Sequence, residues 1–356
     1  MIKYEHGADI YSTANKFNVG ENKILDFSSN INPLGIPTSV KEAYLKSLEI
    51  CDRYPDPRLR KLSREIGNYE KISQDWIFIS NGASEAIYRI VLSLKPQKAL
   101  LTAPTFGEYE EALNVIETDI SYYYLKEEKN FDLDEDFINF ITNDLDILFI
   151  CNPNNPTGRL IQKGLMISIL KKTLKTDTYV VVDESFMDFF LKKIENTLVN
   201  FLESYSNLIV LKSFTKIYSI PGIRLGYCLS SNTDLINNIK KNGPPWNISA
   251  VAEACGITAL KEKKYIKKSV DYIKIQRDYL IQELINLGFK VYDSKANYIL
   301  FRINKSLKLK ELLEENYILI RSCSNYKGLN DKFYRIAVKN KKDNDILIDK
   351  LKKVIK

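Results

Sequence analysis

A lysine and an arginine that could do chemistry lie close together in the second half of the chain. Lys216 ends the stretch Ser213-Phe214-Thr215-Lys216, which follows an apolar run at 208–211, and Arg224 lies within Gly222-Ile223-Arg224-Leu225-Gly226. A lysine at the end of a buried strand is well placed to lose its proton and act as an amine nucleophile. An arginine nearby can hold a phosphate through its planar guanidinium group. Together they predict an enzyme that carries out its chemistry on a bound aldehyde cofactor.

Three other motifs also stand where a strand is expected to end. Asp183 follows the apolar run 180–182, and a carboxylate buried there needs a partner, such as a protonated ring nitrogen. Gly82-Ala83-Ser84 opens a helical segment, where free backbone N–H groups can cradle a phosphate, although such a motif is more often a simple helix cap. The rigid loop 152–158, with two prolines and three asparagines, lies where α/β proteins bind ligands, or it is an ordinary turn.

Two arginines near the C-terminus, Arg321 and Arg335, lie in or beside apolar strand-like runs. A single arginine of this kind most often forms a surface salt bridge, but two in neighbouring strands indicate an anion site. On physical grounds alone, the N-terminal loops 6–9 and 28–35 are only turns.

The elements that must position these residues alternate between apolar runs and helical patterns. Because several runs are apolar throughout, they predict strands buried on both faces of a mostly parallel, seven-stranded sheet with helices on both sides, an α/β layer. We expect a large domain over 41–244 and a smaller α+β domain built from both termini, 1–40 and 245–356. The expected strands are 76–79, 99–101, 120–124, 147–150, 179–182, 208–211 and 225–229 in the large domain, and 298–301, 318–320 and 333–338 in the small one. One long helical stretch is expected at about 251–287 and a closing helix at 343–355.

Composition excludes several classes of function. The 356 residues include one histidine, His6, so a zinc site built on histidines is excluded, and so is a Ser-His-Asp triad unless His6 serves it. The five cysteines show no C-x-x-C pair and indicate reduced thiols in a core. The net charge of +7 comes from lysines spread over helical segments, which is typical of solvated helix faces rather than of a nucleic-acid surface. No membrane span or signal peptide is expected, and we predict a cytoplasmic protein.

The order of the motifs carries a family resemblance. Asn-Pro-Asn-Asn-Pro-Thr-Gly at 152–158, then Asp183, then the Ser-x-x-Lys that ends at Lys216, then the Arg-x-Gly that begins at Arg224 resembles the fold-type-I enzymes dependent on pyridoxal 5′-phosphate (PLP), the aspartate aminotransferase superfamily. The resemblance covers essentially the whole chain. It implies that PLP is the cofactor and that the fold is the PLP-dependent transferase fold of type I.

The resemblance also assigns roles to residues. Lys216 would bind the cofactor covalently, Asp183 would pair with its ring nitrogen, Asn155 would donate to its phenolic oxygen, and Phe106 would stack on its ring. Tyr54 matches a tyrosine that reaches the cofactor of a neighbouring subunit, which implies a homodimer with shared active sites. The cofactor phosphate would be held by Gly82, Ala83, Ser84, Ser213 and Arg224.

Within this superfamily the chain resembles the threonine-phosphate decarboxylases, which form (R)-1-amino-2-propanol O-2-phosphate and CO2 for the cobalamin side chain. The pointers are His6-Gly7, the segments 26–35, 320–326 and 333–337, and Phe186, where aminotransferases commonly have a tyrosine. The substrate would be a small phosphorylated amino acid. The resemblance gives its carboxylate to Arg335 and Asn155 and its phosphate to Arg321, His6, Gly7 and Asn32, and the two arginine roles could be exchanged.

Three alternatives remain open. A histidinol-phosphate aminotransferase has the same fold and cofactor, but Phe186 and the His6-Gly7 start argue against it. A regulatory module without catalysis would be expected to lose Lys216 or to carry an added DNA-binding domain. Phosphoserine differs from phosphothreonine by one methyl group, which a pocket discriminates by only about 1–3 kcal/mol.

Overall fold

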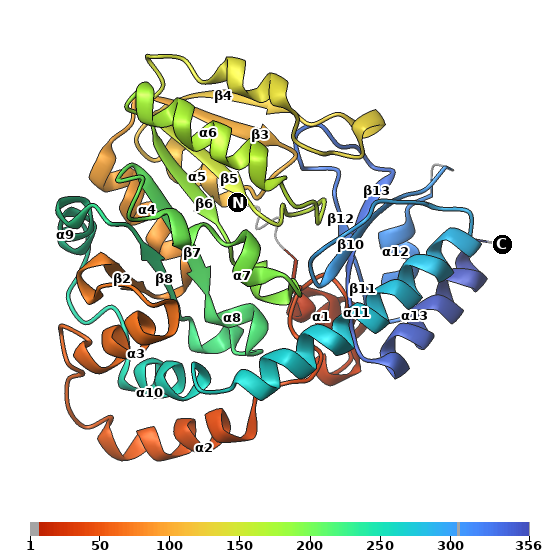
Figure 1. Ribbon diagram of the computed structural model, residues 1–356. Helices are drawn as coiled ribbons and strands as arrows, with labels where there is room; N and C mark the ends of the chain where they lie inside the picture. The colour runs from red at the N-terminus through yellow and green to blue at the C-terminus, as the bar shows by residue number, and fades with distance from the viewer. Residues whose placement is uncertain (1–6, 305–306, 356) are drawn as a thin grey trace.

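The computed structural model describes residues 7–304 and 307–355, and the chain forms a large α/β layer beside a smaller α+β layer (Figure 1). The large sheet has seven strands in the order β2-β8-β7-β6-β5-β3-β4, and only β8 runs antiparallel to its neighbours. The predicted mostly parallel sheet is therefore confirmed. Its strands are β2 (Ile77–Ser80), β3 (Lys98–Ala103), β4 (Asp119–Tyr124), β5 (Ile147–Cys151), β6 (Tyr179–Asp183), β7 (Leu208–Ser213) and β8 (Gly226–Leu229).

Central strands of this sheet are buried on both faces because successive side chains point to opposite sides. In β5, Leu148 and Ile150 join one hydrophobic cluster, whereas Ile147 and Phe149 join the other. Helices α4 (Gly82–Leu94), α5 (Glu108–Asn114) and α9 (Thr233–Lys241) cover the face of Ile147. Helices α3 (Arg60–Glu70), α6 (Lys163–Lys175) and α10 (Ala250–Ala259) contribute to the core on the face of Leu148. The apolar runs of the sequence thus reflect two cores rather than one.

The small layer is built from both ends of the chain (Figure 1). Strand β1 (Leu25–Asp26) pairs in parallel with β11 (Ile318–Leu319), and a separate antiparallel sheet has the order β12-β13-β10-β9. The N-terminal segment thus joins the C-terminal part, as expected, while the bounds 41–244, 1–40 and 245–356 stay a prediction. The other elements are β9 (Lys290–Val291), β10 (Tyr298–Arg302), β12 (Arg321–Ser322), β13 (Phe333–Ala337), α1 (Ile10–Phe17), α2 (Thr38–Ser47), α7 (Lys193–Asn196), α8 (Phe214–Ile217), α11 (Lys263–Asn286), α12 (Leu309–Glu314) and α13 (Lys341–Val354).

The structure divides two of the predicted elements. The stretch expected as one helix at 251–287 is two helices, α10 and α11, and Glu262 between them has non-helical backbone angles (φ −81°, ψ 47°). The strand expected at 318–320 ends at Leu319 as β11, and a separate strand, β12, begins at Arg321. The two strands pair with different partners, β1 and β13. This division sets Arg321 beside Arg335 on the neighbouring strand.

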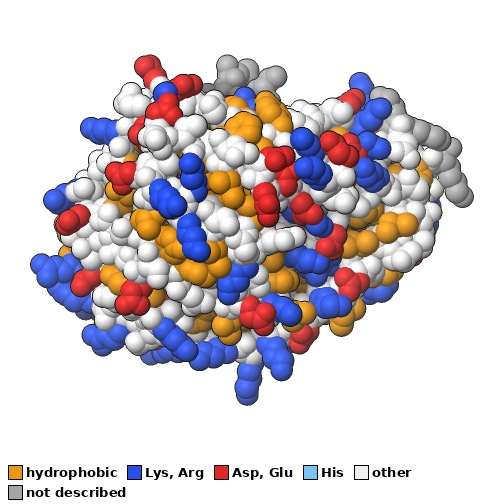
Figure 2. Space-filling model, turned by 45° about the horizontal axis from the view of Figure 1, so that its top comes forward, with side chains coloured by type: hydrophobic (Ala, Val, Ile, Leu, Met, Phe, Trp, Pro, Cys, Tyr) orange, Lys and Arg blue, Asp and Glu red, His pale blue; other side chains and the backbone are white. Residues whose placement is uncertain are grey.

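The surface charges, the helices and the possible metal ligands can be compared with the predicted absence of nucleic-acid, membrane and metal partners. On the face shown in Figure 2, lysine and arginine side chains are interspersed with acidic ones, as expected for solvated helix faces. Among residues 7–304 and 307–355, no helix has the length and apolar character needed to cross a membrane. In the same ranges, no cluster of three or more His, Cys, Asp or Glu side chains could hold a metal ion. The cytoplasmic location stays a prediction.

Candidate active site

A cavity of about 210 Å³ lies at the carboxyl ends of β5, β6 and β7, where parallel sheets usually bind ligands. Most of the candidate residues line it although they come from both layers of the fold. The structure brings together Gly7, Gly82, Ala83, Ser84, Phe106, Asn155, Asp183, Ser213, Lys216, Arg224, Arg321 and Arg335. Asn32 and Tyr54 are not among the lining residues, and His6 lies outside the described part of the chain.

Lys216 is placed by the tight transition from β7 into the short helix α8. Ser213 caps that helix, because its Oγ accepts a hydrogen bond from Thr215 N at 3.3 Å. Burial, and then the positive charges of Arg335 and Arg224, lower the pKa of Lys216 from 10.5 to about 8. A substantial fraction of this amine is therefore neutral near pH 8, as a nucleophile requires.

Asp183 ends β6 and is only 4% exposed. Its Oδ1 accepts a hydrogen bond from Ser185 N at 2.8 Å, and its Oδ2 accepts one from the hydroxyl of Tyr109, also at 2.8 Å. Among the described residues, no lysine or arginine forms an ion pair with this carboxylate. Because a buried charge needs a compensating partner, the site fits a ligand with a protonated ring nitrogen.

The N-terminus of α4 and the guanidinium of Arg224 form a cradle for an anion. Gly82 has φ +78°, and a Cβ atom there would lie 2.6 Å from Arg224 Nη2. Gly226 brings β8 close on the other side, since its Cβ would lie 2.6 Å from Ala83 N. Backbone N–H groups at a helix start and an arginine without an ion-pair partner in the described chain suit a phosphate. The charges of this cradle and of Asp183 therefore fit PLP at both ends.

Arg335 on β13 is a buried cation, only 5% exposed, held by neutral groups. Nη1 donates to Asn155 Oδ1, Nη2 donates to Ser28 O at 2.6 Å, and the ring of Tyr298 lies 5.5 Å from the guanidinium carbon. Its Nε has no hydrogen-bond partner, and within the described ranges it forms no ion pair with a carboxylate. Such a group is suited to hold an anionic part of a substrate.

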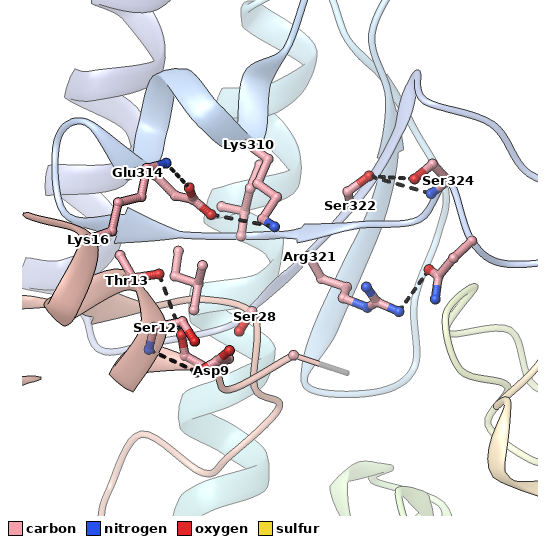
Figure 3. Close-up of a pocket in the computed structure, with 14 residues that line it drawn as sticks. Asp9, Ser12, Thr13, Lys16, Ser28, Lys310, Glu314, Arg321, Ser322 and Ser324 are labelled. Atoms are coloured by element: carbon pink, nitrogen blue, oxygen red, sulfur yellow. Dashed lines mark hydrogen bonds and ion pairs between the residues drawn. The ribbon is translucent and has the colours of Figure 1, made fainter. Parts of the chain in front are cut away.

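Arg321 on β12 lines this cavity and also a second one of about 390 Å³. Figure 3 shows the residues that line the second cavity. Its Nη2 donates to Asn325 Oδ1 at 2.8 Å, and its guanidinium lies over the ring of Tyr326. In the second cavity, Lys16 and Lys310 flank Glu314 on the side opposite Arg321 (Figure 3). Arg321 is therefore the cation that the two cavities share among their described lining residues.

Asn32 has a structural position rather than a place in the cavity wall. Its Nδ2 donates to Ile217 O at 2.7 Å and to Ser269 Oγ at 2.8 Å, and its Oδ1 accepts from Leu34 N. Asn30, two residues earlier, does line the cavity, is 4% exposed, and its Oδ1 has no hydrogen-bond partner in the described chain. Sequence reasoning missed Asn30, because nothing in the motif tells which of the two asparagines faces the cavity.

Tyr54 lies away from the cavity and is 80% exposed, with its ring tilted against Trp246 at 4.9 Å between centroids. Phe186 does line the cavity and packs edge-on against Tyr298. Glu108 was also missed from the sequence, and its carboxylate lies near enough to raise the pKa of Lys216 slightly against the larger lowering effects.

Comparison with known proteins agrees with this geometry. The family model described as "Aminotransferase class I and II" matches residues 22–351. The chain is 34% identical to the threonine-phosphate decarboxylase of Salmonella typhimurium over 100% of this chain and 98% of that protein. Its fold is similar to the crystal structure of the histidinol-phosphate aminotransferase from Clostridium acetobutylicum (TM-score 0.88, 37% identity, 93% of this chain and 99% of that chain).

A third comparison concerns the cofactor. The histidinol-phosphate aminotransferase of Sinorhizobium meliloti, solved in complex with pyridoxal-5′-phosphate, shares the fold (TM-score 0.86, 18% identity, 98% of this chain and 94% of that chain). The length of the family match and the likeness to the Salmonella enzyme over the full chain establish the family. The chain therefore belongs to the aminotransferase class I and II family and is a PLP-dependent enzyme.

Proposed function

We propose that the enzyme decarboxylates L-threonine O-3-phosphate to (R)-1-amino-2-propanol O-2-phosphate and CO2, as part of cobalamin side-chain synthesis. The similarity to the Salmonella decarboxylase supports this reaction. The single structural observation that carries it is Arg335, a buried guanidinium without a carboxylate partner in the described chain, in the same cavity as Lys216.

We assign the cofactor to the residues whose charges fit it. Lys216 would bind it covalently, Asp183 would hold its ring nitrogen, Phe106 would stack on its ring and Asn155 would contact its phenolic oxygen. The phosphate is held by the α4 N-terminus (Gly82, Ala83 and Ser84) with Ser213 and Arg224. PLP, when bound, supplies an electron sink for the pair left at Cα when a bond to that atom breaks.

The chain decides which bond breaks by fixing the substrate on both sides of Cα. We place the substrate carboxylate on Arg335, with Asn155 beside it, and the phosphate on Arg321, Asn30 and the Gly7 loop. Two anion sites fix the rotamer about the N–Cα bond, so the carboxylate, rather than the Cα hydrogen, is held in the position where its bond can break.

The proton that replaces CO2 at Cα can come from Lys216. A lysine with a pKa of about 8 is a mixture of ammonium and amine near neutral pH, so it can give up a proton readily. When the Cα–carboxylate bond breaks, CO2 leaves without the electron pair, and the proton from Lys216 completes the new C–H bond. Lys216 is then left as a neutral amine.

We also propose a homodimer. Tyr54 does not line the cavity of its own subunit, so the role that the family resemblance gives it requires a neighbouring subunit. Tyr54 packs against Trp246, which is 46% exposed, and the apolar side chains of Leu45 and Leu48, earlier in the same region of the chain, are 64% and 55% exposed. A second copy covering this surface would bring Tyr54 toward the partner's cofactor phosphate, the role that the family resemblance gives it. Sedimentation velocity should show a dimer at micromolar concentration, and a monomer with full activity would contradict the shared site.

The second candidate is a histidinol-phosphate aminotransferase, which the likeness to the Clostridium acetobutylicum structure favours. Phe186 argues against it, because this side chain offers no hydroxyl to the cavity. The deciding experiment supplies phosphothreonine alone, or histidinol phosphate with 2-oxoglutarate, and identifies products by NMR. The amino-propanol phosphate from the first mixture supports our proposal, whereas glutamate from the second mixture alone would refute it.

A further inference from the structure

Tyr109 is a buried residue that none of the roles above requires. It lies on α5, its side chain is fully buried, and its ring stacks on Phe149 with 5.1 Å between centroids and 17° between planes. The edge of the Phe106 ring also contacts it, at 5.6 Å and 82°. The hydroxyl therefore has a fixed position, and its hydrogen bond to Asp183 Oδ2 is 2.8 Å long.

The two donors to Asp183 divide its carboxylate evenly. Ser185 N holds Oδ1 and the Tyr109 hydroxyl holds Oδ2, so one lone pair on each oxygen is occupied from within the protein. The Ser185 donor is a backbone N–H, which does not depend on the side chain at that position. The Tyr109 donor is a hydroxyl, which a substitution can remove. A phenylalanine would fill the same apolar space between Phe106 and Phe149 without donating.

We propose that Tyr109 is a positioning residue, which holds the Asp183 carboxylate in the orientation that pairs with the cofactor's ring nitrogen. This inference rests on the role proposed for Asp183. It adds that Asp183 needs the Tyr109 hydroxyl to keep its orientation. Without the hydroxyl, the Asp183 carboxylate can rotate about its side-chain bond and pair less strongly with the ring nitrogen.

The Tyr109 hydroxyl remains a hydrogen-bond donor throughout the pH range below its raised pKa. Burial, and then the nearby negative charge of Asp183, raise the pKa of Tyr109 well above its ordinary value of 10. It therefore remains protonated and never becomes a second anion beside Asp183. Its contribution to the site is a hydrogen bond rather than a charge.

The test compares Tyr109→Phe with Tyr292→Phe. Tyr292 is a matched control because it is also buried and its hydroxyl also donates to a carboxylate, Glu127 Oε1 at 2.6 Å, at residues that do not line the cavity. Two readouts besides activity are used: the equilibrium dissociation constant of PLP, and the midpoint of the pH titration of its visible absorbance. Thermal unfolding of each apoprotein reports the general structural cost.

We expect Tyr109→Phe to weaken PLP binding by about tenfold, as for loss of a hydrogen bond to a charged group. The absorbance midpoint should shift by roughly 0.5 pH unit or more in the same direction as in Asp183→Asn. Tyr292→Phe should change neither quantity. In the Asp183→Asn background, Tyr109→Phe should add little, because the residue acts through Asp183.

The outcomes separate this inference from the proposed function. If Asp183→Asn leaves the midpoint unchanged, the role proposed for Asp183 is wrong, and this inference falls with it. If Asp183→Asn shifts the midpoint but Tyr109→Phe does not, only the role of Tyr109 is refuted. An apoprotein of Tyr109→Phe that no longer folds would also refute it, because the hydroxyl would then serve the fold as a whole.

Discussion

The lowered pKa of Lys216 makes a quantitative prediction about cofactor loading. Only the neutral amine attacks the aldehyde, so the rate of covalent binding should follow the neutral fraction of Lys216. With a pKa of about 8, about one molecule in ten is neutral at pH 7, compared with about one in 3,000 for a lysine with the ordinary value of 10.5. The neutral fraction at pH 7 is thus about 300-fold larger than for an ordinary lysine, and we expect loading to be faster by about that factor.

The perturbation is Arg335→Met, because Arg335 contributes the larger of the two positive charges that lower this pKa after burial itself. Removing that charge should raise the pKa and move the pH profile of loading to higher pH. Arg277→Met is the matched control, since Arg277 is half-buried and donates to a backbone carbonyl, Ala296 O at 2.8 Å, but does not line the cavity.

The assay mixes apoprotein with PLP in a stopped-flow spectrophotometer at pH values from about 6 to 10 and follows the visible absorbance. The observed rate, corrected for the ionisation of free PLP, should rise about tenfold per pH unit and level off near pH 8. Arg335→Met should level off at a higher pH, and Arg277→Met should match the original protein. A plateau that begins only near pH 10.5 in the original protein would refute the reasoning.

Three further predictions follow from other contacts. Lys212→Met should lower the free energy of unfolding by about 3–5 kcal/mol in denaturant titrations, because it leaves buried Glu184 without its positively charged partner. The double variant with Glu184→Met should recover most of this loss, and unchanged stability of the single variant would contradict a buried ion pair. Arg224→Leu should weaken PLP binding by about 2 kcal/mol, or about 30-fold, measured by fluorescence titration, and unchanged affinity would remove Arg224 from the phosphate site. The free energy of unfolding of the apoprotein, measured by chemical unfolding at each pH, should rise between about pH 8 and 10.5. Over that range Lys216 binds fewer protons in the folded state than in the unfolded state. This rise in stability due to Lys216 should be absent in Lys216→Met.

The large sheet and the ends of its strands could be predicted from the sequence because they depend on local patterns. Strands buried on both faces leave continuous apolar runs. Asp183 directly follows such a run, and Lys216 stands three residues after the end of β7. A residue at the carboxyl end of a strand is positioned by that strand. Because the carboxyl ends of parallel strands lie at the same edge of the sheet, such residues lie close together there.

The rest depends on contacts between distant segments, which no local pattern encodes. The break between β11 and β12 is set by their different partners, and it decides that Arg321 lies beside Arg335. Asn30 and Asn32 stand in the same loop, but Asn30 lines the cavity and Asn32 does not. The difference depends on the hydrogen bonds of Asn32 to Ile217 and Ser269, which are distant in the sequence. Tyr109 was not predicted either, because its hydrogen bond to Asp183 joins an early helix to a later strand.

The central claim is that this PLP enzyme breaks the Cα–carboxylate bond of phosphothreonine. The most direct measurement is the release of labelled CO2 from carboxyl-labelled phosphothreonine by the purified, PLP-loaded protein, without any keto acid. We predict one CO2 released for each amino-propanol phosphate formed, at the same rate when 2-oxoglutarate is added. No release of label, together with glutamate formation that requires 2-oxoglutarate, would contradict the account.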